Sequence, residues 1–151
     1  MGICLSYAKS RDLAQEIAHD SFLKFFDSVK KLEDTPSIKP WLRRITVNTA
    51  IDYYRRNKKF QNHEEADGET PVFDAEYAPD QLAYEEILKL LNQLPDDHQL
   101  VFNLYEVEGY SHKEVAERLE ITESSSRVYL TRAKSKLRQL IHIHFKEYAG
   151  R

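Results

Sequence analysis

The segment from Ser111 to Ile141 has the pattern of two helices joined by a tight turn. Ser111 and Glu114 have the spacing of a capping box at the start of the first helix. Thr122 is an N-cap candidate for the second helix. The residues expected to face inward recur at helical spacing after it: Ser126, Leu130, Ala133, Leu137, Leu140 and Ile141. Two helices with so short a connection predict a helix-turn-helix unit.

The second of these predicted helices is basic. It carries Lys or Arg at positions 127, 132, 134, 136 and 138, and no acidic residue lies in that range. A cationic helix in this motif suits the major groove of DNA. A basic helix can also be only a solvated outer face, so the segment alone leaves DNA binding and a plain helical hairpin both open.

Glycine is scarce, with 4 in 151 residues, and few segments alternate with period two, so we expect an all-α protein. No apolar run approaches the roughly 20 residues that span a bilayer, and the first ten residues are too weakly apolar for a signal peptide. We therefore expect no membrane insertion. The lone Cys4 excludes an internal disulfide framework and fits a reducing cytoplasm.

The formal net charge of −3 hides a division of the chain into three blocks. Residues 1–60 carry 12 Lys/Arg and 7 Asp/Glu, residues 61–97 carry 1 and 11, and residues 98–151 carry 9 and 7. Because salt screens charge beyond roughly 8–10 Å, local clusters rather than the total govern attraction to phosphate. Two basic blocks therefore flank one acidic block.

The acidic block contains a predicted linker at residues 60–80, which lacks apolar periodicity and includes Gly68, Pro71 and Pro79. Its composition predicts a flexible, self-repelling segment between a domain at 1–59 and a second domain at 81–148. We favour a plain tether for its role. The alternative is that the acidic segment mimics DNA and masks a basic face when no partner is present.

Two helices are predicted before the linker. The first runs from Leu13 to Val29, and its expected apolar stripe consists of Leu13, Ile17, Phe22, Phe25, Phe26 and Val29. Prolines then interrupt the chain, and the second helix is expected to start at Pro40, a good first helical position. On it, Leu42, Ile45, Thr49 and Tyr53 can share an inner face.

The second helix is rich in basic and aromatic side chains. Seven Lys/Arg occur between Lys39 and Lys59 against a single acidic residue, Asp52. Cations interleaved with Trp41, Tyr53 and Tyr54 suit the binding of phosphates and the stacking of unpaired bases. For Trp41 and Tyr53 a place in the core is an equal alternative.

The order of these motifs resembles bacterial RNA polymerase sigma factors of the extracytoplasmic-function class, in the sigma-70 superfamily. The resemblance rests on A-Q-E-I-A-H-D-S-F at 14–22, W-L-R-R-I-T-V-N-T-A-I-D-Y-Y-R-R at 41–56, and L-P-D-D-H-Q-L-V-F at 94–102 followed by the helix-turn-helix. It covers about positions 10–60 and 82–142. It implies a region 2-like helical bundle and a region 4-like helix-turn-helix domain.

The resemblance also implies roles for the first domain. Glu16, His19 and Asp20 match the segment that docks on core RNA polymerase, where charge complementarity fixes orientation. The basic helix matches the part that recognises and melts the −10 promoter element, with the matched positions being Arg43, Arg44, Asn48, Asp52, Arg55 and Arg56. The loop from Glu33 to Ile38 matches the place that captures a flipped base, whose extrusion binding must offset.

For the second domain the resemblance implies recognition of the −35 element. The positions expected to contact DNA there are Ser124, Ser125, Arg127, Val128, Thr131, Arg132 and Lys134. The implied partners are core RNA polymerase, promoter DNA and an anti-sigma factor, and no cofactor or metal is implied.

Three departures from the family pattern lead to structural expectations. The family has a further long helix ahead of the position of Arg11, where this chain has ten residues, so the first helix is expected to be missing or shortened. Glu120 stands where the family has glycine, which requires a non-glycine residue in a left-handed turn. Ser126 replaces a buried valine, and its hydroxyl needs a partner, for which a backbone carbonyl one turn back is a candidate.

The sequence offers little support for catalysis, because Asp96 and Asp97 follow Pro95 and are better explained as first-turn partners of a helix dipole. His142 and His144 are two apart on a helix and point to different faces, which argues against a shared metal. We expect a non-enzymatic sigma factor. The alternatives are a stand-alone helix-turn-helix regulator and a sigma-like decoy that binds an anti-sigma factor.

Overall fold

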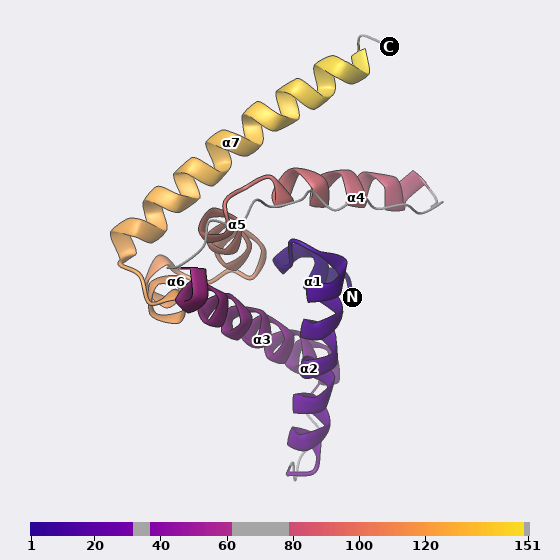
Figure 1. Cartoon of the computed structure of the whole chain (residues 1–151), viewed down its shortest axis with the longest axis vertical. Coiled ribbons are helices and arrows are strands. Elements are labelled where there is room, and N and C mark those ends of the chain that lie inside the picture. The colour runs from indigo at the N-terminus through magenta and orange to yellow at the C-terminus, as the bar shows by residue number, and fades with distance from the viewer. Residues whose placement is uncertain (32–36, 62–78, 150–151) are drawn as a thin grey trace. The chain divides into compact units, whose positions relative to one another are not determined.

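The computed structural model describes residues 1–31, 37–61 and 79–149, and within these ranges every regular element is a helix (Figure 1). The expected all-α class is therefore confirmed. The chain divides into two compact units, Met1–Pro71 and Val72–Arg151. α3 ends at Gln61 and α4 begins at Pro79, so helix overlaps both ends of the predicted linker at residues 60–80.

The first unit contains α1 (Gly2–Tyr7), α2 (Arg11–Val29) and α3 (Ile38–Gln61), and each helix contacts the other two. Ser10 caps α2, because its side chain accepts a hydrogen bond from the amide of Leu13 at 3.2 Å. The apolar core of the unit is built largely from small side chains: Cys4, Ala8, Ala14, Ile17, Val47, Ala50 and Ile51. Small residues at these positions let the helix axes approach one another closely.

The apolar stripe expected on α2 is wrong for its second half. Ile17 is 1% exposed, but Phe22, Phe26 and Val29 are 48%, 58% and 42% exposed. The buried row consists of Ala14, Ile17 and Ser21. Ala14 and Ile17 pack in one cluster with Ala50 of α3, so close approach of the helices favours small residues there, whereas Phe22 and Phe26 stay exposed.

Helix α3 begins two residues earlier than expected. Pro40 lies inside its first turn, where the missing amide hydrogen costs nothing because the first amides of a helix have no intrahelical partner. Of the expected inner face, Thr49 is buried, whereas Leu42, Ile45 and Tyr53 are half-buried. The buried face is instead formed by Thr46, Val47, Thr49, Ala50 and Ile51.

The second unit contains five helical elements: α4 (Pro79–Asn92), α5 (Asp96–Phe102), the π-helix η1 (Asn103–Val107), α6 (His112–Leu119) and α7 (Glu123–Ala149). α7 contacts α4, α5 and α6. The buried apolar residues come from all five elements and the turn before α5: Leu88, Leu91, Leu94, Leu100, Val101, Leu104, Val115, Ala116, Leu119, Leu130 and Ala133. Of the inward positions expected on α7, Ile141 is 41% exposed, because α7 continues past the core.

The helix-turn-helix forms as the local signals predict. The capping box at α6 is present: Ser111 accepts from the amide of Glu114 at 3.2 Å, and the Glu114 carboxylate accepts from the amide of Ser111 at 2.8 Å. The amide and the hydroxyl of Ser111 both donate to this carboxylate, and these two bonds lower the pKa of Glu114. Glu120 takes the left-handed conformation, with φ 56° and ψ 44°. Thr122 then caps α7 by accepting from the amide of Ser125 at 3.0 Å.

None of the helices in the described ranges combines the length and the apolar character that crossing a bilayer requires.

Candidate DNA-binding and polymerase-binding sites

The first two turns of α7 present most of the predicted DNA-contact residues to solvent. Ser124, Arg127, Val128, Thr131 and Arg132 are exposed, and Val128 is 44% exposed. Ser125 is half-buried, and its hydroxyl accepts a hydrogen bond from Thr122 at 2.9 Å. An N-terminal helix turn with free amides and small polar side chains is suited to phosphate and to base edges.

The charges on this surface are partly paired within the helix. Arg127 lies 3.2 Å from the carboxylate of Glu123, one turn earlier. Both side chains are more than 45% exposed, so the pair contributes little to stability and is free to rearrange around a phosphate. Arg132 and Thr131 follow on the next turn, and the Thr131 hydroxyl donates to the Arg127 carbonyl at 3.0 Å.

Lys134 differs from the other predicted contact residues. Its ammonium group forms an ion pair with Glu106 of η1, and the two side chains are 40% and 32% exposed. The structure therefore directs Lys134 toward η1, within the second unit. Sequence periodicity could not show this, because it carries no information on which neighbouring element receives a side chain.

The inner side of the same helix carries a polar contact between helices. Ser126 is completely buried, and its hydroxyl lies 2.9 Å from Nδ1 of His112, the first residue of α6. The partner expected for Ser126, a carbonyl one turn back, is therefore replaced by a side chain 14 residues away. The His112 ring stacks on Tyr105, with centroids 4.3 Å apart. Burial, and then the positive charge of Arg127, lower the pKa of His112.

The basic helix α3 presents its predicted −10 residues unevenly. Arg44 and Arg56 are exposed, whereas Arg43, Asn48, Asp52 and Arg55 are half-buried. The Arg56 guanidinium lies 4.5 Å above the ring of Tyr53. Stacking of this kind orders the guanidinium while leaving its N–H groups available to phosphate.

Asp52, one of the predicted −10 residues, also makes a contact with α2 that the sequence did not predict. Its carboxylate accepts from the ammonium of Lys24 at 3.2 Å, and the same ammonium donates to the Thr49 hydroxyl at 3.2 Å. Lys24 on α2 thus cross-links the two helices. The spacing of 28 residues between Lys24 and Asp52 is not a local signal, so sequence reasoning missed Lys24.

The predicted polymerase-binding residues lie on α2. Glu16 and His19 are exposed, and Asp20 is half-buried. The Tyr53 hydroxyl donates to the Asp20 carboxylate at 2.6 Å, and this bond raises the pKa of Tyr53 to about 12. Asp20 therefore joins α2 to α3 as well as standing beside the exposed Glu16 and His19.

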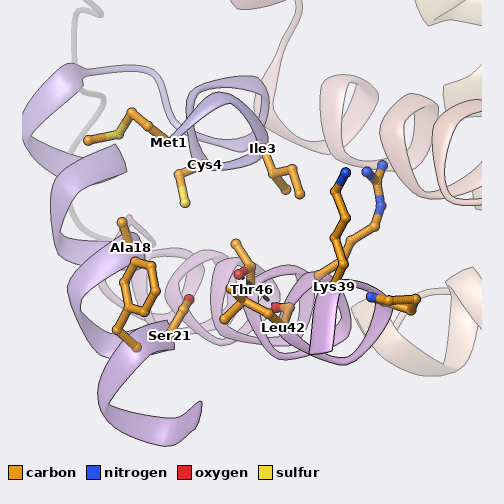
Figure 2. A pocket seen from close by; sticks show the side chains of 11 residues that line it. Met1, Ile3, Cys4, Ala18, Ser21, Lys39, Leu42 and Thr46 are labelled. Carbon is orange, nitrogen blue, oxygen red and sulfur yellow. Dashed lines mark hydrogen bonds between the residues drawn. The ribbon is translucent and has the colours of Figure 1, made fainter. Parts of the chain in front are cut away.

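A pocket of about 410 Å³ lies between α1, α2 and α3. Figure 2 shows Ile3 and Cys4 of α1 on one side of it, Leu42 and Thr46 of α3 on the other, and Lys39 at one end. Its remaining lining residues are Met1, Ala18, Ser21, Phe22, Pro40 and Arg43. The pocket places Arg43, a predicted −10 contact, beside an apolar hollow.

Trp41 packs beside this region. Its ring lies 5.0 Å from that of Phe25, and the side chain is half-buried, so Trp41 packs against α2 while part of it stays accessible to solvent. Of the predicted base-capture loop, residues 33–36 lie outside the described residues, and Ser37 and Ile38 are exposed.

A helical unit with a basic, aromatic helix and a second unit with a capped helix-turn-helix define a two-part DNA-binding protein of the helix-turn-helix class. Residues 1–60 match the family described as Sigma-70 region 2, and residues 84–137 match the one described as Sigma-70, region 4. The chain belongs to the RNA polymerase sigma factors, in the extracytoplasmic-function class of the sigma-70 family.

Several curated relatives agree with this assignment. The RNA polymerase sigma factor SigV of Bacillus subtilis is 30% identical over 115 residues, which are 76% of this chain and 68% of the relative. The ECF RNA polymerase sigma factor SigM of the same organism is 27% identical over 138 residues, 90% of this chain and 84% of the relative. A probable RNA polymerase sigma factor RfaY of Xanthomonas campestris is 29% identical over 96% of this chain, which spans only 38% of that relative's length.

Among solved structures, the sigma factor RpoE of Bartonella quintana, in complex with the anti-sigma factor NepR, superimposes with a TM-score of 0.59. The match covers 93% of this chain and 88% of that one at 21% identity. It supports the fold. Sigma factors are regulatory rather than catalytic proteins, which agrees with the expectation of a non-enzymatic role.

Proposed function

We propose that this sigma factor binds core RNA polymerase in the cytoplasm and directs it to promoters by reading two DNA elements, one with each unit. In this proposal α7 contacts the −35 element in the major groove, and α3 acts on the −10 element. The observation that carries the proposal is the presentation of predicted contact residues on the exposed first turns of α7, behind a completed capping box and left-handed turn.

For the −35 element, we assign the base-facing positions to Ser124, Ser125 and Val128, and the phosphate-facing positions to Arg127 and Arg132. Short polar side chains and an apolar side chain near a helix N-terminus suit base edges and thymine methyl groups. The two arginines suit flanking phosphates, which supply affinity without sequence information. Thr131 lies on the same exposed face, whereas the pairing of Lys134 with Glu106 argues against a direct contact from Lys134.

For the −10 element, we assign phosphate contacts to Arg44 and Arg56, the two exposed arginines of the predicted set. Arg43 and Asn48 lie half-buried on the same helix, and Arg43 lines the apolar pocket. Arg55 is also half-buried, and we assign Asp52 to the contact with Lys24 rather than to DNA. An apolar hollow edged by cations suits an unpaired base next to its phosphate.

We assign the polymerase-binding surface to the outer face of α2, around Glu16 and His19. The exposed Phe22, Leu23 and Phe26 continue this face. Exposed apolar side chains next to acidic ones are typical of a protein–protein interface, in which the apolar residues supply affinity and the charges supply orientation. An anti-sigma factor, as in the complex of the Bartonella relative, is a second partner that we propose for this chain.

The proposal is tested by adding the purified chain to sigma-free core polymerase with a random promoter library, and by sequencing the DNA retained in open complexes. We expect selected DNA to contain two short motifs at a fixed spacing. Duplex binding without core polymerase would instead identify an autonomous regulator. If the chain forms no open complexes and binds no duplex DNA, but does bind an anti-sigma factor, it is a decoy.

Residue assignments are tested by measuring the promoter affinity of the Arg132→Ala and Arg44→Ala variants, assembled with core polymerase, at several salt concentrations. We expect each to weaken binding across all sequences and to reduce the slope of log K against log salt by about one. Lys136→Ala, on the exposed part of α7 beyond the proposed contacts, is the matched control. An equal effect from the control would contradict the assignment.

A further inference from the structure

A hydrogen bond between two side chains joins α6 to α7 across the helix-turn-helix. Nδ1 of His112, the first residue of α6, lies 2.9 Å from Oγ of Ser126, in the first turn of α7. Ser126 is 0% exposed, so its hydroxyl depends on a protein partner. The turn between the two helices connects the C-terminal end of α6 to the start of α7. The hydrogen bond connects the N-terminal end of α6 to α7 as well.

The imidazole is itself held by a third element. Its ring stacks on Tyr105 of η1 at a centroid distance of 4.3 Å and an interplanar angle of 23°. His112 therefore contacts η1 through its ring face and α7 through Nδ1. Because χ1 and χ2 are both constrained by these two contacts, the direction of Nδ1 is fixed.

We propose that His112 and Ser126 form a positioning pair that sets the recognition helix against α6 and thereby controls discrimination of the −35 element. This inference rests on the proposed function. Ser124, Ser125, Arg127 and Val128, which we assign to DNA, are the immediate sequence neighbours of Ser126. Base readout requires side chains held within about 0.5 Å of the productive position, and Ser126 is the inward-facing residue of that same turn.

Burial is the largest cause that lowers the pKa of His112 and favours its neutral form, and the charges around it come second. Arg127 and Lys134 of α7 oppose a positive charge on the ring, whereas Glu123 of α7 favours it. Glu106 of η1, next to Tyr105 in the sequence, is paired with Lys134. In the neutral ring Nδ1 either accepts the Ser126 hydroxyl proton or donates to its oxygen. Protonation makes both ring nitrogens donors, so the Ser126 proton must then find another acceptor.

A double-mutant cycle in the full chain, assembled with core polymerase, tests the pair. The measured quantity is the ratio of affinities for a library-selected promoter and for the same promoter with its −35 element scrambled. His112→Phe keeps a ring on Tyr105 but leaves the Ser126 hydroxyl buried without its partner, and Ser126→Ala leaves Nδ1 without its partner. We expect each to lower the ratio about tenfold, since an unsatisfied buried polar group is costly.

The double variant H112F/S126A is expected to recover most of the ratio, because it removes both polar groups together. His112→Asn, which keeps a hydrogen-bonding atom near the Nδ1 position, is expected to recover part of it. Acidification from about pH 7.5 to about pH 5.5 is expected to lower the ratio for the natural chain and not for His112→Asn. A general gain of phosphate attraction by a charged imidazole would raise both affinities and leave the ratio unchanged.

Ser135→Ala and His142→Asn, at exposed positions of α7, are the matched controls. If the single variants lower the melting temperature but leave the ratio unchanged, the pair is only structural and the proposal is overturned. If the single variants fail to fold, the pH profile of the natural chain decides, and a ratio that acidification leaves unchanged overturns the proposal. A natural chain that discriminates at no pH would instead overturn the proposed function.

Discussion

Glu120 is the one residue other than glycine with positive φ in the described ranges. It ends α6 with φ 56° and ψ 44°, the conformation that glycine adopts at lowest cost. We expect Glu120→Gly to raise the free energy of unfolding of the second unit by about 1 kcal/mol, because relief of left-handed strain exceeds the added entropy of the unfolded chain. Urea unfolding followed by circular dichroism measures the change.

The matched control for Glu120→Gly is Glu117→Gly, the same substitution three residues earlier, at an exposed position inside α6. There glycine is expected to lower stability by about 1 kcal/mol. Equal signs for the two variants would show that the left-handed conformation does not decide the effect.

His112 makes the stability of the second unit depend on pH. Burial and Arg127 lower its pKa below the ordinary value of 6.5, so the unfolded chain takes up a proton that the folded chain resists. The contribution is therefore complete above about pH 6.5 and is lost as the pH falls from there toward the folded value. We expect the melting temperature to decrease when the pH is lowered from about 7.5 to about 5.5, which is about one unit on either side of the ordinary histidine pKa.

The His112→Asn variant is expected to lose part of this pH dependence. His98 shifts in the same direction, through burial and the charge of Arg132, so His98→Asn is expected to remove a further part. An NMR titration that placed the pKa of His112 above 6.5 would contradict both the sign and its physical cause.

Between elements, the link from Tyr53 to Asp20 is a short hydrogen bond between α3 and α2. Tyr53→Phe keeps the ring under Arg56 and removes only the hydroxyl. We expect the first unit to lose about 1–2 kcal/mol, since a bond to a carboxylate exceeds a neutral one. Tyr54→Phe is the control, because the Tyr54 hydroxyl accepts a long hydrogen bond from Lys58, at 3.4 Å and at an exposed position. Equal losses in thermal unfolding would refute this account.

The ion pair between η1 and α7 restrains a lysine that the sequence assigned to DNA. Glu106→Gln is expected to free Lys134 for a phosphate, and so to steepen the salt dependence of promoter binding by about one unit of slope. Glu117→Gln, which removes the same charge from an exposed position on α6, is the control. An unchanged slope for Glu106→Gln would return Lys134 to a purely structural role.

At this scale the sequence predicts what is encoded locally. The capping box at Ser111, the cap at Thr122 and the turn at Glu120 each depend on residues within four positions, and all three are confirmed. The predicted buried face of α2 was wrong for its second half. Close approach of the helices favours small residues such as Ala14 and Ser21, and hydrophobic periodicity does not detect them. The partners of Ser126 and Lys134 lie 14 and 28 residues away, beyond any helical repeat.

The whole molecule consists of two units with separate cores. Cys4, Ala8, Ala14, Ile17 and Ala50 form one cluster, all within the first unit, and Leu91, Leu94 and Ala133 form another, all within the second. Cooperative unfolding requires shared buried surface. Each unit is therefore expected to unfold on its own, with its own stability.

The single tryptophan makes this independence measurable. Trp41 belongs to the first unit and packs 5.0 Å from the ring of Phe25, so its fluorescence reports the unfolding of that unit, whereas circular dichroism reports the helices of both. We expect the two signals to give different urea midpoints. Tyr53→Phe should move the fluorescence midpoint, and Glu120→Gly should move only the dichroism transition. A single midpoint that moved with either variant would mean that the units fold as one body.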